Sequence, residues 1–308
     1  MKKDWKASLA RAFPEARFDE PLSRHTTFRI GGPADAYVAA RDAGEVARLY
    51  RLARRMGKAV FVIGWGSNLL VRDGGMRGIV LRLRGEFEKI RFPGGLLVRA
   101  GAGVRLPALV TRCASRSLSG SESLIGVPGT VGGALAMNAG TRDGEIGDLV
   151  REVSVFDPGT LKTAVLPRRE IEFRYRWSSL QDRLVLGVLL ELKAGDKGDI
   201  MARVRDFQSR RKKTQPIHAY NVGSIFKNPP GHFAAKLIEE AGLKGRTAGG
   251  ARISPLHANF IENDRKARAW DVLALAEFAR AAERERFGVE LELEMKVVGE
   301  EAPRPAQA

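Results

Sequence analysis

The sequence predicts a globular protein of mixed α and β structure with two or three domains. Three observations support this prediction: a length of 308 residues, helical and strand periodicities that alternate along the chain, and two glycine-rich segments. A chain of this length can bury a substantial core, and 44% hydrophobic with 29% charged residues is an ordinary globular balance. The order of the elements leaves open whether the domains are α/β or α+β.

The first unit is predicted to span residues 1–84. Asp42 and Glu45 are spaced as a helix-capping pair, and an apolar stripe with helical period then runs to Gly57. Residues 59–63 and 78–83 have the apolar pattern of strands. The polar stretch that follows residue 84 predicts the first domain boundary.

Residues 85–205 are predicted to form the second unit. A helix should begin near Pro107, which suits a first helical turn. Residues 150–156, 162–166 and 184–192 resemble strands, and the last is apolar enough to be central in a sheet.

A third unit is predicted over residues 206–299. It contains expected helices at 234–241 and 268–286 and a closing strand at 289–298. Residues 300–308 are expected to be a flexible tail.

Charge and cysteine usage make several classes of protein less favoured. The net charge of +16 arises from 52 basic and 36 acidic residues, and favours small anionic ligands or an ordinary basic surface. Basic runs interleaved with aromatic residues are absent from the sequence, so a nucleic-acid partner is not expected. Cys113, in a helical pattern, is expected in the core, and the histidine spacing predicts no metal site. No signal peptide or membrane span is predicted, so we expect a cytoplasmic protein.

Two glycine-rich segments, the first cradle (residues 64–68) and the second cradle (residues 126–134), carry the strongest functional signal. Glycine permits close backbone approach, and successive peptide N–H groups form a nest for phosphate oxygens. Neither segment fits a Rossmann turn or a phosphate-binding P-loop. A tight turn between strands is the alternative for either one, but two together favour a ligand with a diphosphate.

Other candidate residues are ambiguous when taken alone. Ser224 follows a glycine and could be an ordinary turn residue, and Arg176 could be a surface charge. Glu290, Glu292 and Glu294 alternate with apolar residues, as on the solvent face of a strand. From the residues alone, the prediction ends at a protein that binds a dinucleotide-like anion.

Seven segments, in order, resemble the UDP-N-acetylenolpyruvoylglucosamine reductases, flavoenzymes of peptidoglycan precursor synthesis. They cover nearly the whole chain from about residue 20 to 299. The segments are residues 25–33, 64–71, 126–140, 175–176, 223–229, 257–260 and 288–299.

The resemblance implies an α+β fold. A two-part FAD-binding domain of the vanillyl-alcohol-oxidase-like (PCMH) type would be followed by a C-terminal α+β substrate domain. FAD would be tightly bound, and NADPH would be the hydride donor. The cofactor would contact both cradles, at Gly64, Gly66, Ser67, Asn68, Gly126, Val127, Pro128, Gly129, Thr130, Gly132, Gly133 and Ala134.

The implied reaction reduces the enolpyruvyl ether of a UDP-sugar. Hydride would reach the vinyl carbon distal to the carboxylate, Arg176 would stabilise the resulting enolate, and Ser224 would donate the quenching proton. Glu294 would share the role of Arg176, and we expect it to be buried with a raised pKa, unlike Glu290 and Glu292. The substrate contacts would be Tyr175, Lys227, Asn228 and His257.

The chain departs from the family pattern in three places. Trp65 stands where a small or polar residue is expected, and residues 219–222 replace a Pro-Ser-like turn. Ser224 lies only 48 residues after Arg176, too few for a tyrosine-bearing loop. We therefore expect the shorter class of the family, in which another group covers the substrate, and a monomer. There are two alternatives: another FAD oxidase or dehydrogenase on the same scaffold, and a basic nucleic-acid protein.

Overall fold

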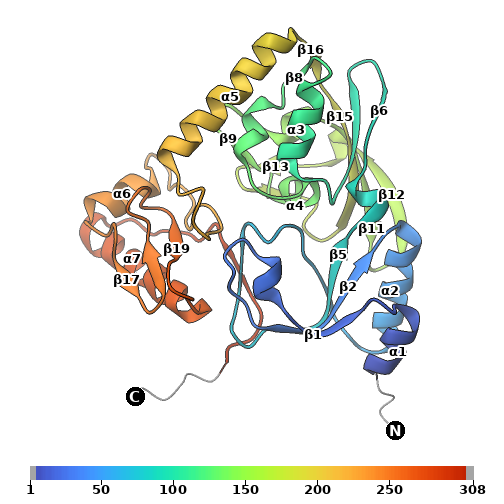
Figure 1. Cartoon of the computed structure of the whole chain (residues 1–308), viewed down its shortest axis with the longest axis horizontal. Coiled ribbons are helices and arrows are strands. Elements are labelled where there is room, and N and C mark those ends of the chain that lie inside the picture. The colour runs from blue at the N-terminus through green and yellow to red at the C-terminus, as the bar shows by residue number, and fades with distance from the viewer. Residues whose placement is uncertain (1–4, 303–308) are drawn as a thin grey trace. The chain divides into compact units, whose positions relative to one another are not determined.

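The computed structural model describes residues 5–302, which form two compact units (Figure 1). Unit 1 contains residues 5–17, 36–65 and 79–211, and unit 2 contains residues 18–35, 66–78 and 212–302. Each unit is therefore built from segments that are far apart in the sequence. The division that we expected at residues 84 and 205 stays a prediction.

A five-stranded antiparallel sheet forms the centre of unit 1, in the order β12-β11-β15-β7-β6. Its middle strand, β15, is almost entirely buried, which confirms the prediction that this apolar segment is central. The strands are β6 (Ile90–Gly94), β7 (Leu97–Gly101), β11 (Val150–Asp157), β12 (Lys162–Pro167) and β15 (Leu184–Glu191).

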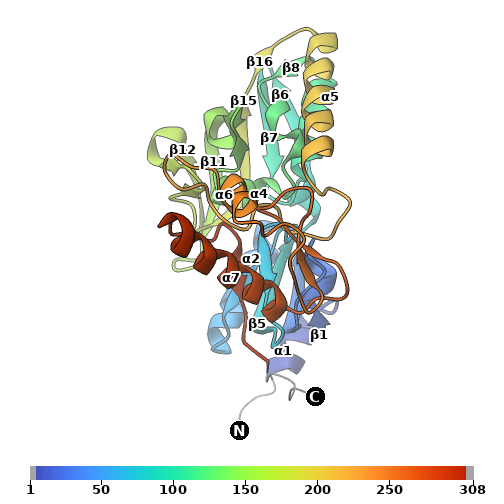
Figure 2. The same ribbon diagram turned by 90° about the vertical axis from the view of Figure 1, so that its left-hand side faces the viewer.

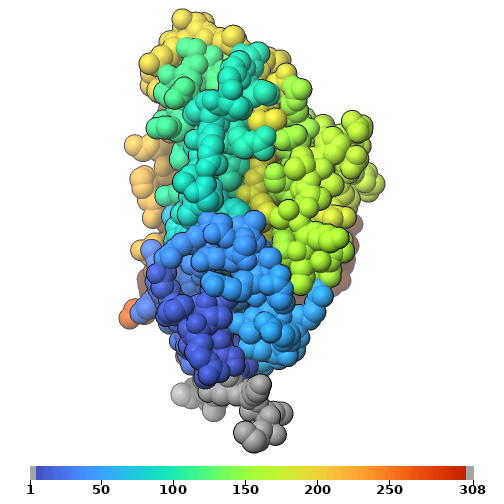
Figure 3. All heavy atoms as spheres, turned by 90° about the vertical axis from the view of Figure 1, so that its right-hand side faces the viewer, coloured from blue at the N-terminus to red at the C-terminus, as the bar shows by residue number. Residues whose placement is uncertain are grey.

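A second sheet has the order β1-β2-β5-β3, in which β3 and β5 are parallel. Its strands are β1 (Arg17–Pro21), β2 (Pro33–Ala40), β3 (Val60–Val62) and β5 (Met76–Leu83). Helix α2 (Ala43–Arg55) begins as predicted, because the side chain of Asp42 accepts a hydrogen bond from the Glu45 N–H at 2.8 Å. Arg54, near its end, donates to the carbonyl of Pro158 in the β11–β12 hairpin (2.9 Å), and Figure 3 shows this face of unit 1.

The remaining helices of unit 1 are α1 (Trp5–Ala12), α3 (Leu106–Ala114), α4 (Val131–Ala136) and α5 (Lys197–Thr214), whose last three residues belong to unit 2. Cys113 lies on the buried side of α3, as expected, and burial raises the pKa of its thiol to about 12. Three short two-stranded ribbons complete the unit. They are β8 (Leu118–Ser119) with β16 (Lys193–Ala194), β9 (Gly140–Thr141) with β10 (Gly144–Glu145), and β13 (Phe173–Arg174) with β14 (Trp177–Ser178).

Unit 2 has its own apolar core, in which helices α6 (Ala234–Glu240) and α7 (Ala269–Phe287) pack together (Figure 2). Gly288 ends α7 in the left-handed conformation (φ 65°), as a C-terminal glycine should. A three-stranded sheet runs in the order β17-β18-β19, and β20 pairs in parallel with β4. These strands are β4 (Leu69–Val71), β17 (Thr247–Ala248), β18 (Ala251–Ile253), β19 (Ile261–Asn263) and β20 (Lys296–Val298).

The closing strand is shorter than predicted, because the chain changes partner along its length. Leu293 pairs with Phe226, whereas only β20 pairs with β4. Beyond β20, Glu300 exchanges backbone hydrogen bonds with residues 74–75 (2.9 Å each). The remainder of the predicted tail, residues 303–308, lies outside the described residues, as do residues 1–4.

None of the helices within residues 5–302 combines the length and the apolar character that crossing a membrane requires.

Candidate active site

The first cradle follows β3 and turns sharply at Gly66. Gly66 has φ +65°, and a Cβ there would lie 2.4 Å from the carbonyl oxygen of His25. The Thr27 N–H donates to the Gly66 carbonyl at 3.2 Å. Only glycine fits this position, so residues 25–27 fix the path of the first cradle.

The second cradle lies beside the first. Gly129 has φ +138°, and it leads into Thr130 and the short helix α4. A Cβ on Gly64 would approach the Thr130 hydroxyl to 2.6 Å, and one on Gly132 would approach the Ala102 side chain to 2.9 Å. Glycine at position 64 therefore permits the two cradles to lie in contact, and glycine at position 132 permits the second cradle to pack against Ala102.

The cradles also present unused hydrogen-bond donors. Within residues 5–302, the peptide N–H groups of Gly64, Trp65, Gly66, Gly129 and Thr130 have no acceptor. Peptide N–H groups are normally satisfied by protein, water or ligand, and groups of adjacent ones bind anions. The residues present therefore fit the diphosphate of a dinucleotide such as FAD. Within the same residues, no cluster of His, Cys, Asp or Glu is suited to a metal ion.

Arg176 lies in the two-residue turn between β13 and β14. Its φ of +56° is left-handed, which is uncommon for a residue with a side chain and is frequent at functional sites. The guanidinium lies 4.8 Å from the centroid of the Tyr175 ring, and Tyr175 itself is exposed. The buried Asn138 fixes this hairpin, since its Nδ2 donates to the Arg174 carbonyl at 3.1 Å.

Ser224 lies in unit 2, directly before two residues, Ile225 and Phe226, whose backbones are hydrogen-bonded to Asn259. The Ile225 N–H donates to the Asn259 carbonyl at 2.9 Å, and the Asn259 side chain bonds both the N–H and the carbonyl of Phe226 (2.9 and 2.8 Å). Ser224 is half-buried, after Gly223 with φ +82°. The asparagine of the 257–260 segment thus positions the serine segment.

Glu294 reaches the same place from the C-terminal segment. Its N–H donates to the Ile225 carbonyl at 2.8 Å, and its carbonyl accepts from the Asn68 side chain at 3.0 Å. Glu294 is half-buried, where we expected full burial, while Glu290 and Glu292 are exposed as expected. Four of the segments that carry the resemblance therefore meet within unit 2.

Two predicted substrate contacts already have protein partners. Lys227 forms an ion pair with Glu292 at 2.5 Å. The Asn228 side-chain oxygen accepts from the Ala234 N–H at 3.1 Å, where α6 begins. These interactions give both residues a structural role, so their contact with substrate stays a prediction.

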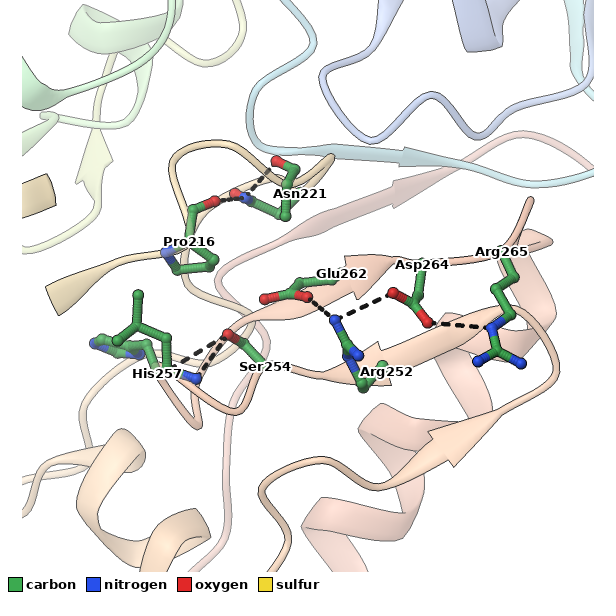
Figure 4. A network of polar contacts seen from close by, with 10 residues as sticks. Pro216, Asn221, Arg252, Ser254, His257, Glu262, Asp264 and Arg265 are labelled. Atoms are coloured by element: carbon green, nitrogen blue, oxygen red, sulfur yellow. Dashed lines mark hydrogen bonds and ion pairs between the residues drawn. The ribbon is translucent and has the colours of Figure 1, made fainter. Parts of the chain in front are cut away.

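His257 is half-buried in a polar loop of unit 2 (Figure 4). Its N–H and that of Leu256 donate to the Ser254 hydroxyl (3.4 and 3.2 Å). Burial, followed by the nearby charge of Lys244, lowers the pKa of the imidazole. Its Nδ1 is buried and has no hydrogen-bond partner within residues 5–302. Because this nitrogen is enclosed by protein, contact of His257 with substrate stays a prediction.

The roles of Asn138 and Asn259 were not predicted from the sequence. Both lie in segments that carry the resemblance, and that was the only available signal. The tertiary partners of an asparagine leave no mark in its sequence neighbourhood.

The fold and the cradles define an FAD-binding protein. Residues 34–163 match the family model of an FAD binding domain, and residues 215–298 match that of the UDP-N-acetylenolpyruvoylglucosamine reductase C-terminal domain. The chain belongs to the UDP-N-acetylenolpyruvoylglucosamine reductase family. The predicted resemblance and the predicted α+β fold class are both confirmed.

Individual relatives cover nearly the whole chain. UDP-N-acetylenolpyruvoylglucosamine reductase 2 of Symbiobacterium thermophilum is 44% identical over 294 residues, 95% of each chain. The Moorella thermoacetica reductase is 44% identical over 92% of this chain and 93% of its own. The crystal structure of the reductase (MurB) from Thermus caldophilus has 39% identity and a TM-score of 0.79, covering 92% of this chain and 98% of that one. Membership of the shorter class stays a prediction.

Proposed function

We propose that this protein reduces UDP-N-acetylglucosamine enolpyruvate to UDP-N-acetylmuramate, with FAD as cofactor and NADPH as hydride donor. The observation that carries the proposal is the pair of adjacent cradles with unused peptide donors, in a chain 44% identical to a reductase of this name. The product is a precursor of peptidoglycan.

The residues that would hold FAD are those of the two cradles. Their peptide N–H groups would bind the diphosphate, and their glycines permit its close approach. Bound FAD supplies the hydride carrier between NADPH and the substrate.

Ser224 is the proton donor in this proposal. As hydride adds to the carbon distal to the carboxylate, the π electrons move toward the carboxylate side, and the Ser224 hydroxyl protonates the carbon there. The serine oxygen then regains a proton from solvent. A hydroxyl is a weak acid, so nearby cations must help it. Lys227 is the cation nearest to Ser224 in sequence, and burial, followed by the charge of Lys227, lowers the pKa of Lys296.

Arg176 stabilises the enolate in this proposal, and Glu294 shares that role either as a protonated carboxyl group or by orienting Arg176. A guanidinium presents several donors in a fixed plane, which suits a carboxylate and its conjugated enolate. The left-handed turn at Arg176 supports this assignment, because strained positions persist where the surrounding structure enforces them. Substrate contacts are assigned to Tyr175, Lys227, Asn228 and His257.

A direct assay tests the proposed function. The purified protein should show flavin absorbance, oxidise NADPH only when the enolpyruvyl UDP-sugar is present, and yield a product two hydrogen atoms heavier by mass spectrometry. A colourless protein that binds no FAD, or a flavoprotein that leaves the UDP-sugar unchanged, would refute the proposal. The monomeric state, the cytoplasmic location and the absence of a nucleic-acid partner stay predictions.

A further inference from the structure

The ring of Trp65 lies against two arginine side chains within unit 1. The guanidinium carbon of Arg105 is 3.6 Å from the ring centroid, and that of Arg82 is 5.5 Å from it. Both distances are within the range of cation–π attraction. Arg105 is exposed, Arg82 is buried, and the indole between the cradle backbone and these arginines is half-buried.

This stack connects the two cradles. Trp65 belongs to the first cradle, next to Gly64, which contacts Thr130 of the second. Arg105 pairs through its backbone with the same Thr130. The two cradles are therefore connected twice. Thr130 lies next to Gly64 and pairs with the Arg105 backbone, and the Arg105 side chain stacks on Trp65.

Neither arginine of the stack is neutralised by an acid. Within residues 5–302, Arg82 and Arg105 form no ion pair with a carboxylate, although Arg82 hydrogen-bonds the Tyr37 hydroxyl. An arginine over an aromatic ring keeps its charge and its in-plane donors. The stack therefore places uncompensated positive charge at the cradles, where the open peptide donors already favour an anion.

We propose that Trp65 is a positioning residue that holds Arg105 at the two cradles, and that the Arg105 guanidinium strengthens binding of the cofactor diphosphate. This inference rests on the proposed function, which places FAD in the cradles. It also accounts for the large aromatic residue in a cradle position where a small or polar residue was expected.

Affinity for FAD tests the proposal. FAD is removed from the full-length protein and titrated back, with the dissociation constant read from the change in flavin fluorescence. We expect Arg105→Gln and Trp65→Leu each to weaken binding by about tenfold, the size of one charge-assisted contact. Trp65→Phe keeps an aromatic face and should lose less. The double variant should be little weaker than either single one, because both remove the same interaction.

Arg116→Gln is the matched control. Arg116 is also exposed in unit 1 and lies 4.2 Å from the Phe92 ring centroid, so the control removes a similar stack outside the cradles. Its FAD affinity should equal that of the wild type. Circular dichroism and thermal unfolding identify any variant that fails to fold.

Salt dependence separates a charge effect from a packing effect. The affinity of the wild type should fall more steeply with salt than that of Arg105→Gln, because the variant has lost one cation at the anion. Equal affinity of Arg105→Gln and Arg116→Gln, equal salt slopes for wild type and Arg105→Gln, or weaker binding in Trp65→Leu alone would overturn the inference. Failure of the wild type to bind FAD would instead refute the proposed function.

Discussion

Two buried asparagines, one in each unit, fix the segments that carry the proposed catalytic side chains, and they do so in different ways. Asn138 in unit 1 has the left-handed φ of +43°. Its Nδ2 donates to Glu145 and to the Arg174 carbonyl, and its Oδ1 accepts from the Gly147 N–H at 3.1 Å. It therefore joins its own segment to two others, residues 145–147 and the β13–β14 hairpin.

Asn259 in unit 2 makes both of its side-chain bonds to one residue. Its oxygen and nitrogen bond the N–H and the carbonyl of Phe226, two positions after Ser224. The segment that carries Ser224 is thus fixed directly, because the Asn259 side chain bonds the backbone of Phe226. The Arg176 turn is fixed through a neighbour and holds a left-handed residue. The turn at Arg176 thus places a residue with a side chain in the left-handed region, whereas the segment at Ser224 makes its left-handed turn at Gly223, where glycine adopts that conformation without strain.

Loss of the serine hydroxyl should have the largest effect. Ser224→Ala should slow reduction of the enolpyruvyl substrate by about 10²–10⁴-fold, the range for a general acid. It should leave the reduction of FAD by NADPH nearly intact. Rapid-mixing absorbance measures the two steps separately, and Ser224→Cys should recover part of the lost rate. Equal loss in both steps would remove Ser224 from the proton-donor role.

Replacing Arg176 tests the strained side of the comparison. Arg176→Ala should lower kcat by about 10²–10³-fold, as loss of a group that stabilises an oxyanion does. Arg176→Gly should be equally slow but more stable than Arg176→Ala by about 1 kcal/mol, because glycine adopts left-handed φ without cost. Steady-state kinetics and urea unfolding measure both. A glycine variant less stable than the alanine variant would show that the turn is not strained.

The two asparagines can be compared by stability. Asn259→Ala should lower the free energy of unfolding by about 2–3 kcal/mol, since it leaves backbone groups of Phe226 unsatisfied. Asn138→Ala should cost about 3–4 kcal/mol, because it loses more bonds and keeps a side chain at positive φ. Asn138→Gly, without that strain, should fall between the two. A larger loss for Asn259→Ala would reverse the comparison.

Helix α7 of unit 2 lies outside both asparagine sites. We expect a change there to have the smallest effect on stability, and that effect should depend on pH. Glu283 is fully buried, neither carboxyl oxygen has a hydrogen-bond partner within residues 5–302, and burial raises its pKa from 4.5 to about 7. The folded protein thus holds this proton more tightly than the unfolded chain, so its stability falls as pH rises from about 4.5 through 7.

Glu283→Gln should therefore be more stable than the wild type by about 1–3 kcal/mol at pH 8, and nearly equal to it at pH 4. Urea unfolding at both pH values measures this difference. A difference that does not change with pH would contradict the assignment to Glu283.

Local patterns predicted much of the fold. The capping pair at Asp42 and the glycine at 288 located α2 and the end of α7, and apolar content identified β15 as the central strand. Strand β2 was missed because it is rich in alanine, which has low strand propensity, and pairing with its neighbours places it. The closing strand was overextended, since a change of partner leaves no local signal.

The candidate site was predicted less completely than the fold. Glycine spacing indicated two phosphate nests, because glycine and peptide donors act locally. The hydrogen bonds made by the Asn138 and Asn259 side chains join segments that are distant in the sequence, such as Asn259 with Phe226. The stack of Trp65 on Arg105 has the same origin. The prediction of the site was therefore limited by contacts between residues that are far apart in the sequence, and not by the chemistry of the residues themselves.

An anaerobic titration of the purified wild-type protein tests the central claim most directly. NADPH should bleach the flavin absorbance, and the enolpyruvyl UDP-sugar should then restore it without oxygen, with one equivalent of UDP-N-acetylmuramate formed. Colour that stays bleached after the UDP-sugar is added, and returns only when air is admitted, would contradict the proposed reaction.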